Sequence, residues 1–268
     1  MENYILGNKE AWEEAFEMRD KSWVADIINR IQQEDYAYFN QDTIETFKHY
    51  NLEGKTIGQF CCNNGRELLS LVKTTKAAAG VGFDIAENMI AFADEKAQVL
   101  KLPCEFVATN ILEIDDTYKN RFDMVFITIG ALCWFKNLHE FFKVVTKCMK
   151  EDGIIVINEQ HAFTNMLATS GDDEYEETYP LNCAFSYFER EWIGNDGMGY
   201  IVGRQYHSKT FTDYTHSISE IIGAMCANHL IITNMKEFDY DVSGGFSYFD
   251  HQGFPLSMIL EGRKETRD

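Results

Sequence analysis

The sequence predicts an α/β fold, and the arrangement of apolar runs, turn residues and acids in its first third carries this prediction. A short apolar run from Ile57 to Cys62 meets the polar turn Asn63-Asn64-Gly65, and an amphipathic helical pattern follows at once. A second apolar run, Ala79 to Phe83, then ends in Asp84. Strand, tight turn, helix, strand and acid are the layout of a nucleotide-binding βαβ unit, in which backbone N–H groups approach the ligand and the acid accepts from ribose hydroxyls.

The turn also carries a resemblance to a known family. From the end of the first strand the residues read Gln59-Phe60-Cys61-Cys62-Asn63-Asn64-Gly65, and the later segment reads GFDIAENMIAFADEKA. Both resemble class I S-adenosylmethionine-dependent methyltransferases, whose common pattern is (D/E)-x-G-x-G-x-G. Gln59 replaces the acid, Cys61 and Asn63 replace two glycines, and Gly65 remains. The substitutes are physically sensible, because asparagine tolerates the left-handed backbone region and cysteine is small.

The resemblance implies a doubly wound, mostly parallel, seven-stranded Rossmann-like sheet with strand order 3-2-1-4-5-7-6 and an antiparallel last strand. It divides the chain into an N-terminal helical cover (1–50), a cofactor-binding core (51–161), a lid inserted after strand five (162–210) and the C-terminal part of the sheet (211–268). Residues 8–33 read as one amphipathic helix, and the cover offers Trp12, Tyr36, Tyr38 and Phe39 as aromatics over the cofactor. Alternation in Tyr200, Val202 and Tyr206 predicts short antiparallel strands in the lid.

The cofactor that the resemblance implies is S-adenosylmethionine, with S-adenosylhomocysteine as its product. The resemblance places Asp84 at the ribose and the Cys61, Asn63 and Gly65 turn at the methionine part. Ile85, Met89, Asn110 and Ile111 are placed around the adenine. Thr128, at the carboxyl end of the predicted fourth strand, completes the expected cofactor site. Four of these residues also have a purely structural interpretation. Asp84 also fits a helix N-cap, Asn63 and Gly65 a generic βα turn, and Asn110 a turn residue.

The acceptor side depends on residues near the predicted carboxyl ends of later strands. His161 and His216 are the candidate catalytic groups, because histidine is the natural general base near neutral pH. A sulfonium methyl donor needs only alignment and proximity, so His161 could equally hydrogen-bond to the lid and His216 to its helix start. Trp134, Tyr206 and Tyr214 are candidates for the substrate pocket, and Trp134 could instead seal the sheet edge.

Composition limits the partners. The chain has 268 residues, a net charge of −19 and a pI of about 4.7, so its surface repels phosphate backbones and nucleic acid is not the expected substrate. The seven cysteines are an odd number and scattered, which favours reduced thiols and a cytoplasmic location. No apolar stretch reaches membrane-spanning length, no metal-ligand spacing is present, and a homodimer is compatible with the sequence.

Three functions follow, in order of preference. The first is an enzyme that moves the methyl group of S-adenosylmethionine to a small-molecule acceptor by bimolecular displacement. The second is a non-catalytic regulatory protein that binds S-adenosylmethionine or S-adenosylhomocysteine. The third, a nicotinamide-dependent oxidoreductase, is disfavoured by the turn pattern.

Overall fold

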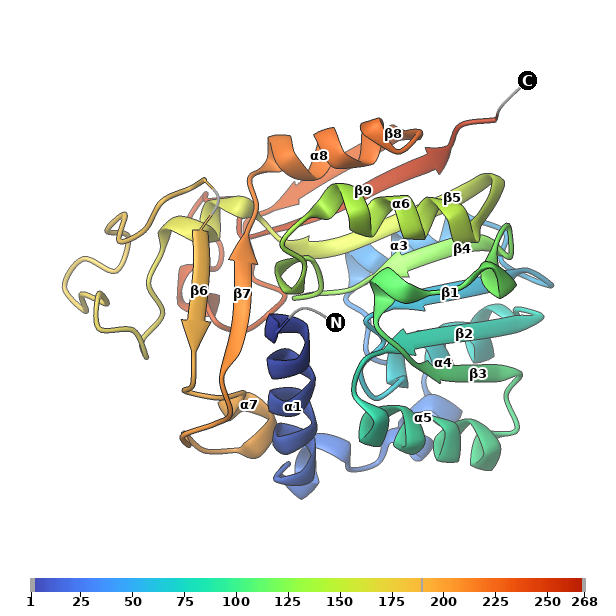
Figure 1. The fold of residues 1–268 in the computed structure, drawn as a ribbon, viewed down its shortest axis with the longest axis horizontal. Helices are drawn as coiled ribbons and strands as arrows, with labels where there is room; N and C mark the ends of the chain where they lie inside the picture. Colours follow the sequence, from blue (N-terminus) through green and yellow to red (C-terminus); the bar gives the residue numbers. More distant parts are fainter. Residues whose placement is uncertain (1–2, 189, 267–268) are drawn as a thin grey trace.

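The computed structural model describes residues 3–188 and 190–266, and a seven-stranded sheet forms its centre (Figure 1). The sheet strands are β1 Thr56–Phe60, β2 Ala79–Asp84, β3 Cys104–Ala108, β4 Phe122–Ile127, β5 Met149–Gln160, β8 Leu230–Phe238 and β9 Ser257–Lys264. Their spatial order is β3-β2-β1-β4-β5-β9-β8. This confirms the predicted order, in which the sixth and seventh sheet strands exchange places at one edge.

Strand direction also follows the prediction. The pairs β1–β2, β1–β4, β2–β3 and β4–β5 are parallel, while β9 runs antiparallel to both β5 and β8. The carboxyl ends of the parallel strands therefore meet at one edge of the sheet, which is where open α/β sheets bind ligands.

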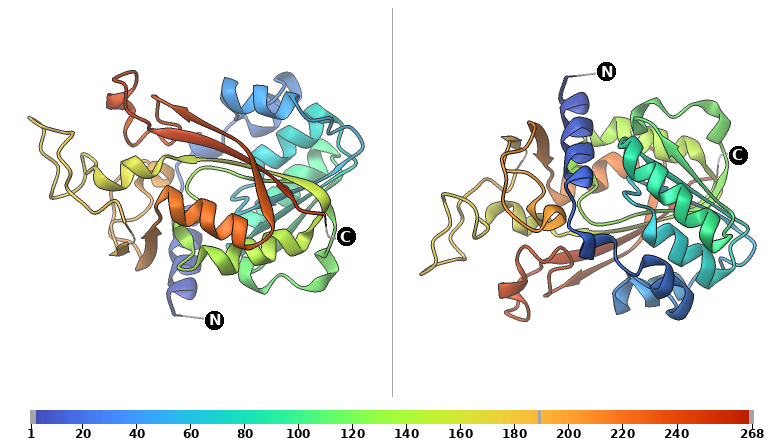
Figure 2. Two further views of the ribbon diagram at one scale, coloured as in Figure 1. Left: turned by 90° about the horizontal axis from the view of Figure 1, so that it is seen from above. Right: turned by 90° about the horizontal axis from the view of Figure 1, so that it is seen from below.

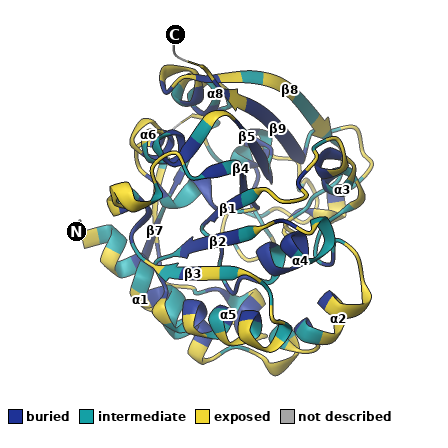
Figure 3. Cartoon of the chain, turned by 90° about the vertical axis from the view of Figure 1, so that its right-hand side faces the viewer, coloured by how far each residue is buried: buried dark blue, intermediate teal, exposed yellow. Residues whose placement is uncertain are grey.

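Helices cover both faces of the sheet (Figure 2). The longer ones are α1 Asn3–Glu17, α2 Ile27–Gln33, α3 Gln41–Lys48, α4 Arg66–Thr75, α5 Glu87–Leu100, α6 Leu138–Cys148 and α8 Ile218–Ala227. One apolar core joins α6 and α8 to one face, and a second joins α2, α3, α4 and α5 to the other. Successive side chains of β4 point to opposite faces of the sheet and so enter different cores: Val125 and Ile127 enter the first, and Met124 and Phe126 the second. The central strands are accordingly buried while the edges β3 and β8 are partly exposed (Figure 3).

A smaller layer lies beyond the carboxyl ends of the strands. It contains a two-stranded antiparallel sheet of β6 Arg190–Gly194 and β7 Phe211–Thr215, the short helix α7 Gly199–Val202, and α1 (Figure 1). The Asn8 side chain fastens α1 to this layer. Its amide donates to the Thr212 carbonyl at 2.8 Å and accepts from the Thr212 N–H at 2.7 Å, so it bonds to β7 as a neighbouring strand would.

Short 3₁₀ turns connect several of these elements: η1 Lys21–Val24, η2 Ile111–Glu113, η3 Asp116–Tyr118, η4 Leu132–Trp134, η5 Ala162–Met166 and η6 Ser247–Phe249. None of the helices in the described ranges has both the length and the apolar run that a bilayer crossing requires.

Two local predictions were wrong. The helix expected over 8–33 is broken between α1 and α2, where the Asp20 carboxylate accepts from the Ser22 N–H at 2.7 Å and Asp26 has a φ of 57°. The alternation around Tyr200 and Tyr206 marks no strand, because Gly199–Val202 forms α7, which ends at Gly203 with a φ of 77°. The strands of this layer are β6 and β7 instead.

Candidate functional site

A cavity of about 730 Å³ opens at the carboxyl edge of the sheet. Its walls come from the segments that follow β1, β2, β3 and β4, from α1 and η1, from Tyr200 of α7, and from Val242–Gly245 between β8 and β9. We call it the main cavity. Its size is typical of sites for small molecules and cofactors.

The turn after β1 shapes the cavity floor through left-handed backbone. Cys61 and Asn63 have φ angles of 58° and 52°, and both line the cavity. Gly65 has a φ of 73°, and a Cβ there would come within 2.7 Å of the Phe106 ring and the Ala93 side chain. Gly65 is therefore required by close packing of the turn against its neighbours, and it does not itself line the cavity.

Asp84 lies at the end of β2 and forms the acidic wall of the cavity. Its carboxylate accepts from the Asn63 N–H at 2.8 Å and from the Ala86 N–H at 3.1 Å. The carboxylate thus joins the turn after β1 to the segment before α5, but it is not the helix cap that the sequence also allowed, because the N-cap of α5 is Ala86 and no side chain caps it. Burial raises the pKa of Asp84, against backbone N–H bonds that favour the charged form. Because a carboxylate has about four lone-pair sites, acceptor capacity remains for a ligand.

Asn110 follows β3 and lines the same cavity together with Ile111. The Asn110 side-chain oxygen accepts from the Leu112 N–H at 3.1 Å and so caps η2. The residue is only 6% exposed. The capping bond fixes the orientation of the amide, so that its remaining hydrogen-bonding capacity is available at the cavity wall.

An acid missed by the sequence reasoning completes the wall near β1 and β4. Glu67, in the first turn of α4, lines the cavity and accepts from the Thr128 hydroxyl at 2.6 Å and the Gln59 amide at 2.8 Å. The Gln59 oxygen is buried without a hydrogen-bond partner in the described chain. Gln59 replaces the acid of the family pattern, and Glu67 brings a carboxylate to its amide. The sequence feature that could have identified Glu67 is its position, because this acid follows the turn glycine after only one residue, Arg66.

Helix α1 closes one side of the cavity. Ile5, Asn8 and Trp12 line it, and the Trp12 ring meets Trp134 edge-to-face with centroids 5.5 Å apart. Among the four aromatics that the sequence offered for the cover, Trp12 lies at the cavity wall, while Tyr36, Tyr38 and Phe39 pack against the core around α2 and α4.

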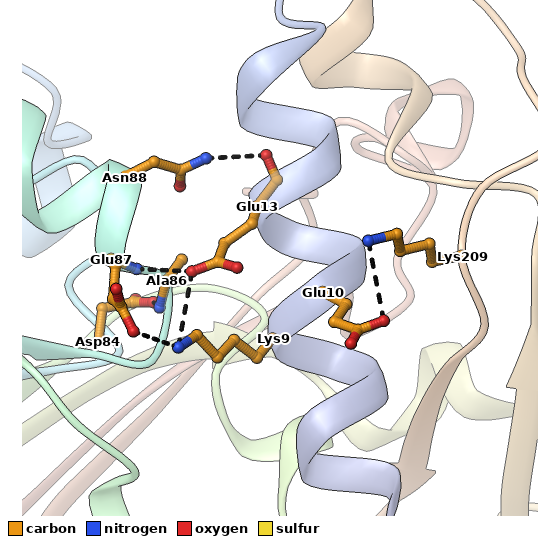
Figure 4. Close-up of polar contacts among 8 residues, drawn as sticks. All are labelled: Lys9, Glu10, Glu13, Asp84, Ala86, Glu87, Asn88 and Lys209. Carbon is orange, nitrogen blue, oxygen red and sulfur yellow. Dashed lines mark hydrogen bonds and ion pairs between the residues drawn. The ribbon is translucent and has the colours of Figure 1, made fainter.

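Polar contacts fasten α1 across the start of α5 (Figure 4). Lys9 pairs with Glu87, the Glu13 carboxylate accepts from the Glu87 N–H at 3.1 Å, and the Asn88 amide donates to the Glu13 carbonyl at 2.9 Å. The Asp84 carboxylate lies directly beside these contacts between α1 and α5 (Figure 4). The cover is therefore held next to the acid that would meet a bound ribose.

Several predicted residues lie away from the main cavity. Met89 is fully buried in the core between α1, α5 and α7, because its turn of α5 faces that core. Tyr206 packs over Gly197 and belongs to the edge of the same core. Tyr214 and His216 line a second, smaller cavity, and the His216 ring lies 2.9 Å from the Phe135 carbonyl oxygen.

Both ring nitrogens of His161 have partners in the protein. Its Nδ1 accepts from the Phe163 N–H at 3.0 Å, and its Nε2 lies 2.9 Å from the Glu237 carboxylate. Burial lowers the pKa of His161, partly opposed by Glu237. The ring lines neither cavity and holds the backbone after β5.

The second cavity has a volume of about 330 Å³ and lies between the carboxyl end of β5 and the β6–β7 sheet. Gly130, Cys133 and Gln160 line both cavities. The buried Glu159 carboxylate fixes this junction, because it accepts from the Gly130 N–H at 2.6 Å and the Ala131 N–H at 3.0 Å. Burial raises the pKa of Glu159, while these backbone bonds oppose the shift. The described residues include no group of three or more His, Cys, Asp or Glu side chains placed to hold a metal ion.

The strand order and the antiparallel β9 define a class of fold, the Rossmann-like fold of methyltransferases. Residues 53–192 match the family model described as a methyltransferase domain. A Geobacillus sp. (strain WCH70) protein, whose name assigns it as a methyltransferase, is 27% identical over 177 residues, which cover 61% of this chain and 69% of that protein. The chain therefore belongs to the methyltransferase-domain family.

Solved structures share the fold at low sequence identity. An S-adenosylmethionine-dependent methyltransferase structure from Listeria monocytogenes has a TM-score of 0.62 at 16% identity, covering 83% of this chain and 97% of that one. One from Mesorhizobium loti has a TM-score of 0.60 at 13% identity, covering 87% and 100%. Geranyl diphosphate C-methyltransferase from Streptomyces coelicolor A3(2) has a TM-score of 0.56 at 11% identity, covering 90% and 82%.

Proposed function

We propose that this chain transfers the methyl group of S-adenosylmethionine to a small-molecule acceptor. The observation that carries the proposal is the charge of the main cavity. Among the described residues that line it, the charged ones are Arg66, Glu67 and Asp84. S-adenosylmethionine carries an ammonium, a sulfonium and one carboxylate, so two acids and one base in the cavity complement its charges.

Each end of the cofactor has a group of suitable chemistry. Asp84 offers its remaining acceptor capacity to the ribose hydroxyls, beside its bonds to the Asn63 and Ala86 N–H groups. Glu67 is held by Thr128 and offers its carboxylate to the ammonium group. Arg66, the neighbour of Glu67, supplies the positive charge for the carboxylate.

The adenine would lie between the segments after β2 and β3. Ile85 provides an apolar surface there, and Asn110 and Ile111 provide the amide and the opposite wall. Cys61 and Asn63 bring left-handed backbone against the methionine part. Met89 and Gly65 support these segments from behind and do not contact the cofactor in this assignment.

The bound cofactor supplies a methyl group on a sulfonium, which is already a strong electrophile. The protein's own contribution is to bind, orient and exclude water. Helix α1 and the β6–β7 layer close the space around Trp134 and the junction residues Gly130, Cys133 and Gln160. That enclosure favours a small acceptor. The Streptomyces coelicolor enzyme, which has the same fold, acts on a small molecule, geranyl diphosphate.

The setting proposed is the cytoplasm, without nucleic acid as a substrate. The cysteines in the described ranges are all unpaired, as a reducing compartment requires. The net charge of −19 repels polyanions.

Calorimetric titration with S-adenosylmethionine, S-adenosylhomocysteine and NAD tests the cofactor assignment. We expect the first two to bind and NAD not to bind; binding of NAD alone would contradict it. Release of S-adenosylhomocysteine, followed with a metabolite extract as the acceptor source, then tests turnover. Tight cofactor binding without any turnover across fractionated extracts would favour the non-catalytic regulator.

A further inference from the structure

The second cavity has a wall that the cofactor assignment does not use. In the β6–β7 sheet, Arg190 lies opposite Thr215 and Trp192 opposite Asp213. Residues directly opposite one another share a face of an antiparallel pair, and so do alternate residues along each strand. These four side chains therefore lie on one face of the sheet, and all four line the second cavity.

Arg190 presents a cation on this wall that forms no ion pair with a described acid. Its guanidinium carbon lies 4.0 Å from the centroid of the Phe185 ring and 5.4 Å from that of Trp192. Its Nε is buried and has no hydrogen-bond partner among the described residues. Stacking on the rings fixes the guanidinium plane while its edge stays free, which is the arrangement that receives a planar carboxylate in two hydrogen bonds.

Of the described acids that line this cavity, Asp213 is the one whose carboxylate holds no other part of the protein by a hydrogen bond. Asp172 accepts from the Thr169 N–H at 2.6 Å and from the Thr169 hydroxyl at 3.0 Å, and Glu159 binds backbone N–H groups. No side-chain hydrogen bond holds Asp213 to another described residue, and its carboxyl interacts with Arg190 only through space. Its negative charge is thus available to a donor group on a ligand.

Asp213 lies on β7, which packs against η4, the turn that carries Cys133; the Phe211 and Trp134 rings meet there with centroids 6.2 Å apart. The charge of Asp213 also contributes to the raised pKa of the Cys133 thiol, after the larger effect of burial. Cys133 lines both cavities. A ligand group that bonds to Asp213 would therefore lie close to the junction through which the main cavity is reached.

Resting on the proposed function, we propose that the second cavity binds the methyl acceptor, and that this acceptor is a small carboxylic acid with an apolar body. Its carboxylate binds the Arg190 guanidinium. Its hydroxyl or amino group donates a hydrogen bond to Asp213 near the junction. Phe185 and Trp192 cover its apolar part. The positive charge at Arg190 and the acid at Asp213 set the direction in which the acceptor lies.

Saturation-transfer-difference NMR tests this with defined probes, in the presence and absence of S-adenosylhomocysteine. The probes are phenylacetate, 4-hydroxyphenylacetate and 3-phenylpropionate, each compared with its amide. We expect at least one acid to bind at least fivefold more tightly than its amide. Arg190→Gln should abolish that preference, and Arg190→Lys should keep part of it. Lys136→Gln is the matched control, because Lys136 pairs with Glu191 on β6 and does not line the cavity.

The outcomes separate this proposal from the proposed function. If no acid binds better than its amide, or if Arg190→Gln keeps the preference, the acceptor assignment is overturned even when S-adenosylhomocysteine binds normally. If the wild-type protein fails to bind S-adenosylhomocysteine, the proposed function fails, and the acid–amide comparison without it still decides whether Arg190 selects a carboxylate. Titration of each variant with S-adenosylhomocysteine shows whether the main cavity is intact.

Discussion

Replacing Asp84 by alanine should weaken S-adenosylhomocysteine binding by at least about 100-fold. The carboxylate accepts from the Asn63 and Ala86 N–H groups, at 2.8 and 3.1 Å, and in the proposed assignment it also accepts from the two ribose hydroxyls. Hydrogen bonds to a charged group are worth about 1.5–3 kcal/mol each. Losing two therefore costs ~3–6 kcal/mol of binding free energy, and every 1.4 kcal/mol is about tenfold in affinity.

The same variant should also lose stability, because two backbone donors beneath the cavity lose their acceptor, at about 1–3 kcal/mol each. Isothermal titration calorimetry gives the affinity, and chemical denaturation gives the stability separately. Glu87→Gln is the control. Glu87 is an exposed acid in the first turn of the adjoining helix, pairs with Lys9, and does not line the cavity (Figure 4). A folded Asp84→Ala protein that binds within about threefold of wild type would refute the ribose assignment.

Three further predictions follow from other side chains. Glu67→Gln should weaken S-adenosylhomocysteine binding about 10- to 100-fold but leave 5′-methylthioadenosine, which lacks the amino-acid end, unaffected; equal losses in calorimetry would mean that Glu67 meets no ammonium group. Burial raises the pKa of Asp213 from 3.8 to about 6, so the folded state keeps a proton that the unfolded chain has released, and stability falls as pH rises through that window. Asp213→Asn should therefore be more stable than wild type by up to ~3 kcal/mol at pH 8 and equal to it below pH 4; urea denaturation showing the same gain at both pH values would contradict this. Iodoacetamide at pH 8 should label the exposed Cys183 and Cys226 first, since burial raises the pKa of the Cys133 thiol; mass spectrometry finding Cys133 labelled first would oppose the burial argument.

Local sequence predicted the parts of the site that local chemistry determines. The turn after β1, the acid that ends β2 and the asparagine after β3 could be located because each follows an apolar strand directly. Asp84 and Asn110 both line the main cavity. The strand order was also predicted correctly, through the family resemblance of those same segments.

The remainder of the site depends on contacts between distant segments. Val242–Gly245 enters the cavity from the loop between β8 and β9, and the Gln160 amide donates to the Ser243 hydroxyl at 2.8 Å. Arg190 and Asp213 lie on one face of a sheet only because β6 pairs with β7. Glu67 was overlooked because an acid in a first helical turn is common, and its bond to Thr128 spans 61 residues of sequence. The histidines drew attention through their chemistry, although packing turns His161 toward Glu237.

A crystal structure with S-adenosylhomocysteine tests the central claim most directly. We expect electron density in the main cavity, with both ribose hydroxyls within hydrogen-bond distance of the Asp84 carboxylate and the amino group near Glu67. Density elsewhere, or a cavity that stays empty at saturating ligand while the turn at Cys61 to Asn63 closes over it, would contradict the account.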